Sequence, residues 1–247
     1  MKLTPSLLEK TLERVIKINT LNQNSKNWKP VTFEIQGIHG LGKTSIVKKV
    51  ATKLGLNFVK YNAAQISDAG DLTGRPTEEY ECCLDHGDCI WITDKLVDSY
   101  KALGFEFTGN TRTGYAKPQW LTGLNESKGG ILLLDDWTRA HGDVLQAVME
   151  LMLDQAYVSW SLPKGWTIIL TSNPEKDEAS GHHYNVTSTD KAQSTRYLSF
   201  ELMFSVKDWV TEMAHWGLND DIIAFASIHP EFVTGMSPRL FTIFGQM

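Results

Sequence analysis

One eight-residue segment constrains the fold of this chain more than any other feature of the sequence. Residues 37–44 read Gly-Ile-His-Gly-Leu-Gly-Lys-Thr, which places glycines, a lysine and a threonine at the offsets of a phosphate-binding loop. Apolar residues at 31, 33 and 35 predict a strand before the loop, and those at 46, 47, 50 and 54 predict a helix after it, ending at Gly55. A strand, this loop and a helix in that order indicate an α/β fold that binds a nucleoside triphosphate.

The residues of the loop have distinct expected roles. Its glycines leave room for backbone N–H groups around the phosphates, and the helix N-terminus adds a partial positive charge. Lys43 is expected to reach the β- and γ-phosphates, and the Thr44 hydroxyl to ligate Mg²⁺, so that ATP and Mg²⁺ are the predicted cofactors. The residues expected to bind the nucleotide are Gly37, His39, Gly40, Leu41, Gly42, Lys43, Thr44 and Ser45.

A pair of acidic residues follows a short apolar run later in the chain. Residues 131–134 read Ile-Leu-Leu-Leu, as expected of a strand buried on both faces, and Asp135 and Asp136 come directly after them. Beside a phosphate-binding loop, Asp135 is expected to hold the hydrated Mg²⁺, and Asp136 to orient or deprotonate an attacking water. Without the loop, the simpler interpretation would be a strand that ends in two solvated carboxylates.

Strands and helices alternate along most of the chain. Further strands are predicted at 58–61, 167–170 and 197–203, and residues 157–160 are expected to form one arm of a hairpin that turns through 163–165. We therefore expect a five-stranded parallel sheet sandwiched by helices in a nucleotide-binding domain at 1–204. This domain would contain an irregular insert at about 80–121, with one helix at 95–103, and residues 205–247 would form a short helical lid.

Composition limits the classes of partner. The 247 residues carry a net charge of −5, which gives no general attraction to nucleic acid or to anionic membranes. No apolar run approaches the roughly 18 residues of a membrane span, and the first residues lack the apolar run of a secretion signal. These features predict a cytoplasmic protein with no membrane partner.

Three cysteines lie close together in the predicted insert. Cys82, Cys83 and Cys89 have His86 between them, but a structural zinc site commonly takes its four ligands from two separated pairs. We expect reduced thiols in a loop, with a zinc site as the less favoured alternative.

Four further segments occur in the order and at the spacing of one known family. Residues 71–76 read Asp-Leu-Thr-Gly-Arg-Pro, 129–140 contain the acid pair followed by Trp-Thr-Arg-Ala, 168–174 read Ile-Ile-Leu-Thr-Ser-Asn-Pro, and 235–239 read Gly-Met-Ser-Pro-Arg. They resemble the D-L-x-G segment, the Walker B segment, the sensor 1 strand and the sensor 2 motif of AAA+ ATPases of the MoxR-like, dynein-related branch. The resemblance covers residues 31–239, and residues 114–118 resemble bacteriophage-type members.

The resemblance implies roles for three more residues. Asn173 would contact the γ-phosphate or the attacking water, and Arg239 would point at the phosphates from the lid. Arg196, after an expected helical turn at 189–192, would be an arginine finger given to a neighbouring subunit, with Arg139 as the other interface candidate. The expected catalytic residues are Lys43, Asp136, Asn173, Arg196 and Arg239, and Thr44 and Asp135 are the expected metal ligands.

The function implied by the resemblance is a ring-forming, hexameric ATPase that binds Mg-ATP at a subunit interface and remodels a protein partner. Tyr115 and Lys117 in the insert would touch that partner, with simple loop packing as the alternative. Two other functions stay open: a nucleic-acid motor or loader, and a nucleotide-gated assembly module with little hydrolysis. The last is motivated by Asp136, because the family has a longer Glu at this position.

Overall fold

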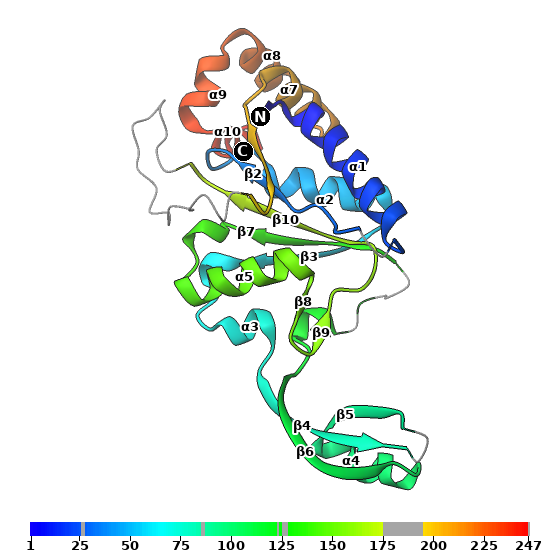
Figure 1. The fold of residues 1–247 in the computed structure, drawn as a ribbon. Coiled ribbons are helices and arrows are strands. Elements are labelled where there is room, and N and C mark those ends of the chain that lie inside the picture. The colour runs from blue at the N-terminus through cyan, green and yellow to red at the C-terminus, as the bar shows by residue number, and fades with distance from the viewer. Residues whose placement is uncertain (26–27, 85–86, 123, 125–127, 175–194, 247) are drawn as a thin grey trace.

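The structure is a computed structural model that describes residues 1–25, 28–84, 87–122, 124, 128–174 and 195–246. Its centre is a parallel sheet with the strand order β1-β11-β2-β10-β7-β3. The strands are β1 (Lys2–Leu3), β2 (Phe33–Gln36), β3 (Asn57–Asn62), β7 (Gly130–Asp135), β10 (Trp166–Ser172) and β11 (Leu198–Leu202). The prediction of a parallel sheet sandwiched by helices is confirmed, and Figure 1 shows these layers.

The sheet has six strands rather than the five that we predicted. The additional strand, β1, pairs in parallel with the edge strand β11, Lys2 opposite Glu201 and Leu3 opposite Leu202. A two-residue strand is too short to show the alternation that identifies longer strands in a sequence. Its pairing is a tertiary feature, made possible because Leu3 is buried in the core.

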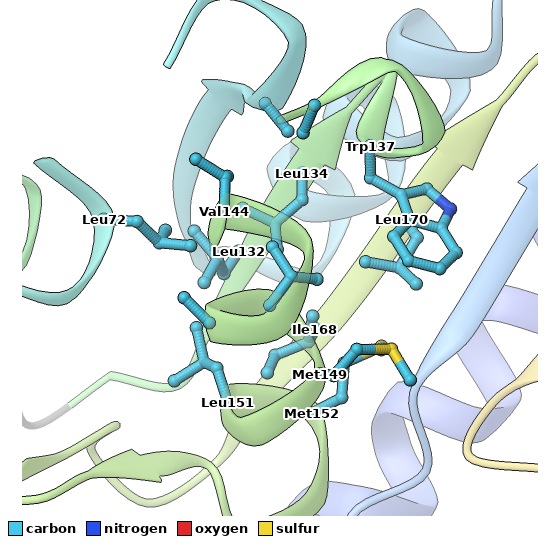
Figure 2. Close-up of a cluster of buried hydrophobic side chains, with 14 of the residues drawn as sticks. Leu72, Leu132, Leu134, Trp137, Val144, Met149, Leu151, Met152, Ile168 and Leu170 are labelled. Carbon is cyan, nitrogen blue, oxygen red and sulfur yellow. The ribbon is translucent and has the colours of Figure 1, made fainter. Parts of the chain in front are cut away.

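Helices cover both faces of the sheet because its strands are apolar on both sides. On one face α1 (Pro5–Asn22) and α2 (Lys43–Leu54) pack against Phe33, Ile35, Ile131, Leu133 and Ile169. On the other face α5 (Gly142–Asp154) packs against the alternate residues of the same strands, and Figure 2 shows this cluster around Leu132, Leu134, Ile168 and Leu170. Burial of this double-sided core is the main force that holds the strand ends, and hence the site, in place.

The described part of the region that we predicted to be irregular is largely ordered, so the prediction of irregularity was wrong, whereas the one helix predicted there, at 95–103, is present. Its elements are β4 (Pro76–Cys83), β5 (Cys89–Thr93), α4 (Asp94–Ala102) and β6 (Glu106–Tyr115), and the strands form an antiparallel sheet in the order β5-β4-β6. Figure 1 shows this unit projecting from the core beyond the short helix α3 (Ala69–Thr73). β6 is polar at most positions and β4 contains three glutamates, so the apolar alternation on which a strand prediction depends is weak in these two strands.

The cysteines do not form the reduced cluster that we expected. Cys83 and Cys89 face each other across the β4–β5 pair and are joined by a disulfide, while Cys82 is a buried free thiol on the opposite face of β4. The two bonded sulfurs cannot serve as zinc ligands, and His86 lies outside the described residues.

A small hairpin lies between the insert and the core. It consists of β8 (Ala156–Tyr157) and β9 (Trp160–Ser161), so the chain turns at Val158 and Ser159 rather than through 163–165 as we predicted. Its rings support the base of the insert: Tyr157 lies edge-on to Tyr115, and Trp160 lies edge-on to Trp120. For Tyr115 these contacts match the loop-packing alternative, whereas Lys117 is exposed.

Helices follow the last strand of the sheet. They are α7 (Val206–His215), α8 (Asp220–Ile228), α9 (Pro230–Met236) and α10 (Pro238–Gly245), and α9 was not predicted. They share a core of their own, with Trp209 packed edge-on against Phe241. Within the part of the chain that the structure describes, no helix has both the length and the hydropathy of a transmembrane segment.

Candidate active site

The predicted site residues of the core gather at one edge of the central sheet. β2, β7 and β10 are parallel neighbours, so the segments that follow their carboxyl ends meet at the same edge. The phosphate-binding loop follows β2, Asp135 and Asp136 lie at the end of β7, and Asn173 follows β10. Parallel pairing thus brings together residues that are up to about 130 positions apart in the chain.

The phosphate-binding loop has the backbone that its sequence predicts. Gly40 and Gly42 both have a φ of 81°, in the left-handed region that glycine adopts without strain. Gly42 is the N-cap of α2, so the free N–H groups of the first turn face the loop. His39 and Ser45 are exposed at the rim of this loop.

Lys43 is the buried cation of the site. Its Nζ atom donates hydrogen bonds to the carbonyl oxygens of Gly37, at 2.6 Å, and Ile38, at 3.1 Å. It also donates to Oδ1 of Asn173 at 2.9 Å. Burial lowers the pKa of Lys43 to about 8, although Asp136 and Asp135 act in the opposite direction. A phosphate bound beside Lys43 would raise this pKa again and keep the ammonium group fully charged.

Thr44 and Asp135 lie against each other at the start of α2 and the end of β7. The Thr44 hydroxyl is 3.2 Å from each carboxylate oxygen of Asp135. Thr171 donates a short hydrogen bond to Oδ1 of Asp135, and the Nζ atom of Lys60 lies 2.7 Å from Oδ2. Burial alone would raise the pKa of Asp135, but the hydrogen bonds from Lys60 and Thr171 outweigh it and hold the pKa below its ordinary value. Asp135 is therefore an ionised carboxylate at neutral pH.

These contacts allow a test of whether the residues suit Mg²⁺. The hydroxyl of Thr44 and the carboxylate of Asp135 are hard oxygen ligands of the type that Mg²⁺ prefers, and they already face one another. The ammonium group of Lys60 already lies against the same carboxylate, so this position accommodates a positive charge. The residues present therefore fit a divalent cation.

Asp136 has an unusual backbone conformation. Its φ is 52° and its ψ is 39°, in the left-handed region, and it is the N-cap of the short 3₁₀ helix η3 (Trp137–Arg139). Its backbone N–H donates to Thr171 Oγ1 at 3.1 Å, and its carboxylate accepts a hydrogen bond from the amide nitrogen of Asn173 at 3.2 Å. Asn173 thus joins Lys43 to Asp136 by hydrogen bonds.

Arg239 lies near the loop, at the start of α10. A Cβ atom placed on Gly40 would lie 3.3 Å from the Cβ of Arg239 and 3.4 Å from Oγ of Ser237. The start of α10 therefore approaches the phosphate-binding loop closely, and the positive charge of Arg239 contributes to the lowered pKa of Lys43.

Arg196 lies near the amino ends of the strands, whereas the residues gathered around the loop lie near their carboxyl ends. It precedes β11, in which Leu198 pairs with Phe33, so it lies near the level of Val31 and six residues before Gly37. Six residues of strand span about 20 Å, which is farther than an arginine side chain extends. Arg196 is exposed and cannot reach the loop of its own chain. The turn expected at 189–192 lies outside the described residues.

We predicted no role for three polar residues of the central sheet, namely Lys60, Thr171 and Glu34. Lys60 and Thr171 both contact Asp135. Glu34, which is buried in β2, accepts hydrogen bonds from Trp137, Ser172 and Ser199. A polar residue inside an otherwise apolar strand, as at Glu34 and Thr171, was the signal that could have identified two of them. Lys60 carries no such signal, because a lysine in an edge strand is common.

Comparisons with known proteins give limited similarity. No protein-family model matches the chain. A Lon protease of Mycoplasma mycoides is 33% identical over 67 residues, which are 27% of this chain and 8% of that protein. Among solved structures, a candidate ATPase from Cytophaga hutchinsonii has a TM-score of 0.46 and 17% identity over 83% of this chain and 49% of its own. The RuvB Holliday junction branch-migration motor of Thermotoga maritima has a TM-score of 0.43 and 12% identity over 82% of this chain and 48% of its own. The chain thus spans about half the length of the solved structures that it matches.

Proposed function

We propose that this protein binds Mg-ATP at the phosphate-binding loop and hydrolyses it. The observation that carries this proposal is the hydrogen-bonded chain from Lys43 through Asn173 to Asp136 beside the Thr44–Asp135 pair. In this arrangement Lys43 and the loop N–H groups bind the phosphates, and Asp136 accepts a proton from, or orients, the attacking water. Mg²⁺, when bound, neutralises charge on the phosphate oxygens, and Thr44 and Asp135 are the residues that would hold it.

We infer further that the chain is an AAA+ ATPase of the MoxR-like, dynein-related type. Support comes from the order of its motifs and from the position of each on a strand end: the loop after β2, the acid pair after β7 and Asn173 after β10. The closeness of Arg239 to the loop supports a sensor role for residues 205–247 as a lid, because the lid could then respond to the presence of a γ-phosphate.

A ring in which neighbouring subunits complete each site is the proposed assembly. Its support is the position of Arg196, which is exposed and too distant to serve its own loop. An arginine supplied by a neighbour would stabilise the charge of the transition state and couple hydrolysis to assembly. We take six subunits as the working number.

A mixing experiment tests this assembly. Lys43→Ala subunits cannot hold phosphate, and Arg196→Ala subunits cannot complete a neighbour's site. Mixing the two inactive variants should restore part of the ATPase activity, because a subunit with an intact loop then meets one with an intact arginine. If the mixture stays as inactive as its components, Arg196 does not act across an interface. Size measurements with and without a non-hydrolysable ATP analogue would show whether nucleotide drives the assembly.

The partner that fits best is a protein rather than a nucleic acid. Residues 76–115, which form the projecting insert, contain eight acidic and three basic residues, whereas the rest of the chain contains twenty-one of each. The whole net charge of −5 therefore belongs to the insert, the part of the chain that extends farthest from the core. Such a projection repels phosphate backbones and favours a basic protein surface. Salt-sensitive stimulation of the ATPase by DNA or RNA would support the nucleic-acid motor or loader instead.

A second candidate function is a nucleotide-gated assembly module with little hydrolysis. The observation in its favour is Asp136, whose side chain is one methylene shorter than that of Glu and accepts a hydrogen bond from Asn173. In that case ATP would bind and set the assembly while the γ-phosphate stayed in place. Slow single-turnover hydrolysis with tight ATP binding would favour this module over the motor.

A further inference from the structure

Lys60 forms a close ion pair with Asp135, and the proposed function assigns no role to this pair. It lies on β3, next to β7, and its Nζ atom is 2.7 Å from Oδ2 of Asp135. The two side chains differ in their access to water, because that of Lys60 is 43% exposed and that of Asp135 is 15% exposed. The ammonium group therefore approaches a largely buried carboxylate from the solvent side.

The carboxylate that Lys60 contacts is the one that would bind the metal. Thr44 lies within 3.2 Å of both its oxygens, and Thr171 donates to Oδ1, so the ammonium supplies the positive charge at Oδ2. A buried, ionised carboxylate without a neighbouring positive charge is costly, and Lys60 offsets that cost. The chain thus provides its own cation at the position where the proposed function requires a divalent one.

We propose that Lys60 is an internal counter-cation that competes with Mg²⁺ for Asp135. This inference rests on the proposed function. Without metal and nucleotide, the ammonium keeps Asp135 neutralised and directed at Thr44. Mg²⁺ at the same carboxylate repels the ammonium, and the lysine side chain leaves Oδ2 for the solvent.

The physical balance favours such an exchange. The exchange of Lys60 for Mg²⁺ costs little, because Mg²⁺ replaces the positive charge at Asp135 and a partly exposed ion pair is screened by water. The lysine stem is flexible, and its ammonium group is readily hydrated once released. Lys60 therefore weakens the binding of Mg²⁺ by a modest factor while it keeps the site assembled when the metal is absent.

The test is the Mg²⁺ dependence of nucleotide binding, measured with a fluorescent, non-hydrolysable ATP analogue at constant ionic strength. Lys60→Gln should lower the Mg²⁺ concentration for half-maximal binding about three- to fivefold, as expected when one partly exposed ion pair no longer has to be broken. Lys60→Arg keeps the charge and should stay within about twofold of the wild-type protein. Lys53→Gln is the matched control, because Lys53 also pairs with carboxylates but lies about 15 Å from Lys43 along α2, and it should leave the Mg²⁺ dependence unchanged.

A second measurement separates competition from simple damage to the fold. In EDTA and without nucleotide, Lys60→Gln should lower the melting temperature relative to Lys60→Arg, because Asp135 loses its counter-charge. An unchanged or increased Mg²⁺ requirement in Lys60→Gln would overturn the inference while leaving the proposed function intact. If the wild-type protein fails to bind the analogue at any Mg²⁺ concentration, the proposed function fails and the inference fails with it.

Discussion

The side-chain oxygen of Asn173 accepts a hydrogen bond from the ammonium group of Lys43 at 2.9 Å. The amide nitrogen of the same residue donates to Asp136 at 3.2 Å, so one side chain fixes both the phosphate-binding cation and the proposed base. Neither contact can form unless β2, β7 and β10 end at the same level, because each of the three residues follows a different strand. The chemistry of the site therefore depends directly on the strand order of the sheet.

Asn173→Ala is expected to reduce ATP turnover by about a hundredfold, because an interaction that positions the reacting groups is lost. Affinity for a non-hydrolysable ATP analogue should change much less, since the loop and Lys43 remain. Steady-state phosphate release and analogue binding, measured on the same preparation, check this. An unchanged kcat, with a loss in kcat/KM equal to the loss in binding, would show that Asn173 acts on nucleotide binding alone.

Asp136→Glu tests whether the length of the acid limits the reaction. The additional methylene extends the carboxylate by about 1.5 Å, and a misplacement of about 1 Å can change a rate about a hundredfold. If the left-handed backbone of Asp136 already compensates for the shorter side chain, the longer acid should slow turnover while nucleotide binding is retained. A faster Asp136→Glu enzyme would show that the native acid is too short. Single-turnover hydrolysis is the appropriate measurement.

The lowered pKa of Lys43 predicts a coupling between nucleotide binding and protonation. With a pKa of about 8, Lys43 is partly deprotonated at pH 8 in the protein without nucleotide. The phosphates raise that pKa, so binding at pH 8 to 8.5 should take up about half a proton, and binding at pH 6.5 should take up almost none at this residue. Isothermal titration calorimetry in buffers of different ionisation enthalpy measures this uptake. Uptake that is independent of pH over this range would contradict the assigned pKa.

Glu34 is predicted to matter for stability rather than for chemistry. Its buried carboxylate accepts hydrogen bonds from Trp137, Ser172 and Ser199, and so joins three segments of the core. Glu34→Ala leaves these donors unsatisfied and should lower the free energy of unfolding by about 3 kcal/mol. Glu34→Gln retains an acceptor and should cost clearly less. Denaturant unfolding of the two variants compares them, and equal losses would show that shape rather than hydrogen bonding is responsible.

Much of the core was predictable from the sequence because its signals are local. The loop at 37–44 fixes a strand, a turn and a helix by spacing alone, and the apolar run at 131–134 identifies a strand buried on both faces. Asp135, Asp136 and Asn173 were predicted as neighbours of the loop, and the structure places them there, since parallel strands bring their carboxyl ends together.

The parts that were missed depend on contacts between distant segments. β1 forms only by pairing with β11, and the insert is a sheet whose strands, in β6 above all, show little apolar alternation. The Cys83–Cys89 bond depends on the β4–β5 register, which the cysteine spacing alone does not determine. Lys60 reaches Asp135 only because β3 and β7 are neighbours in the sheet.

Hydrolysis at this site is tested by phosphate release from ATP, measured for the wild-type protein and for Asp136→Asn, with Mg²⁺ present and with Mg²⁺ chelated. We expect Mg²⁺-dependent release by the wild-type protein. We also expect a loss of about a hundredfold or more in Asp136→Asn, which should bind the ATP analogue as tightly as the wild-type protein does. Phosphate release that persists unchanged in Asp136→Asn, or a wild-type protein that binds ATP without releasing phosphate, would contradict hydrolysis at this site.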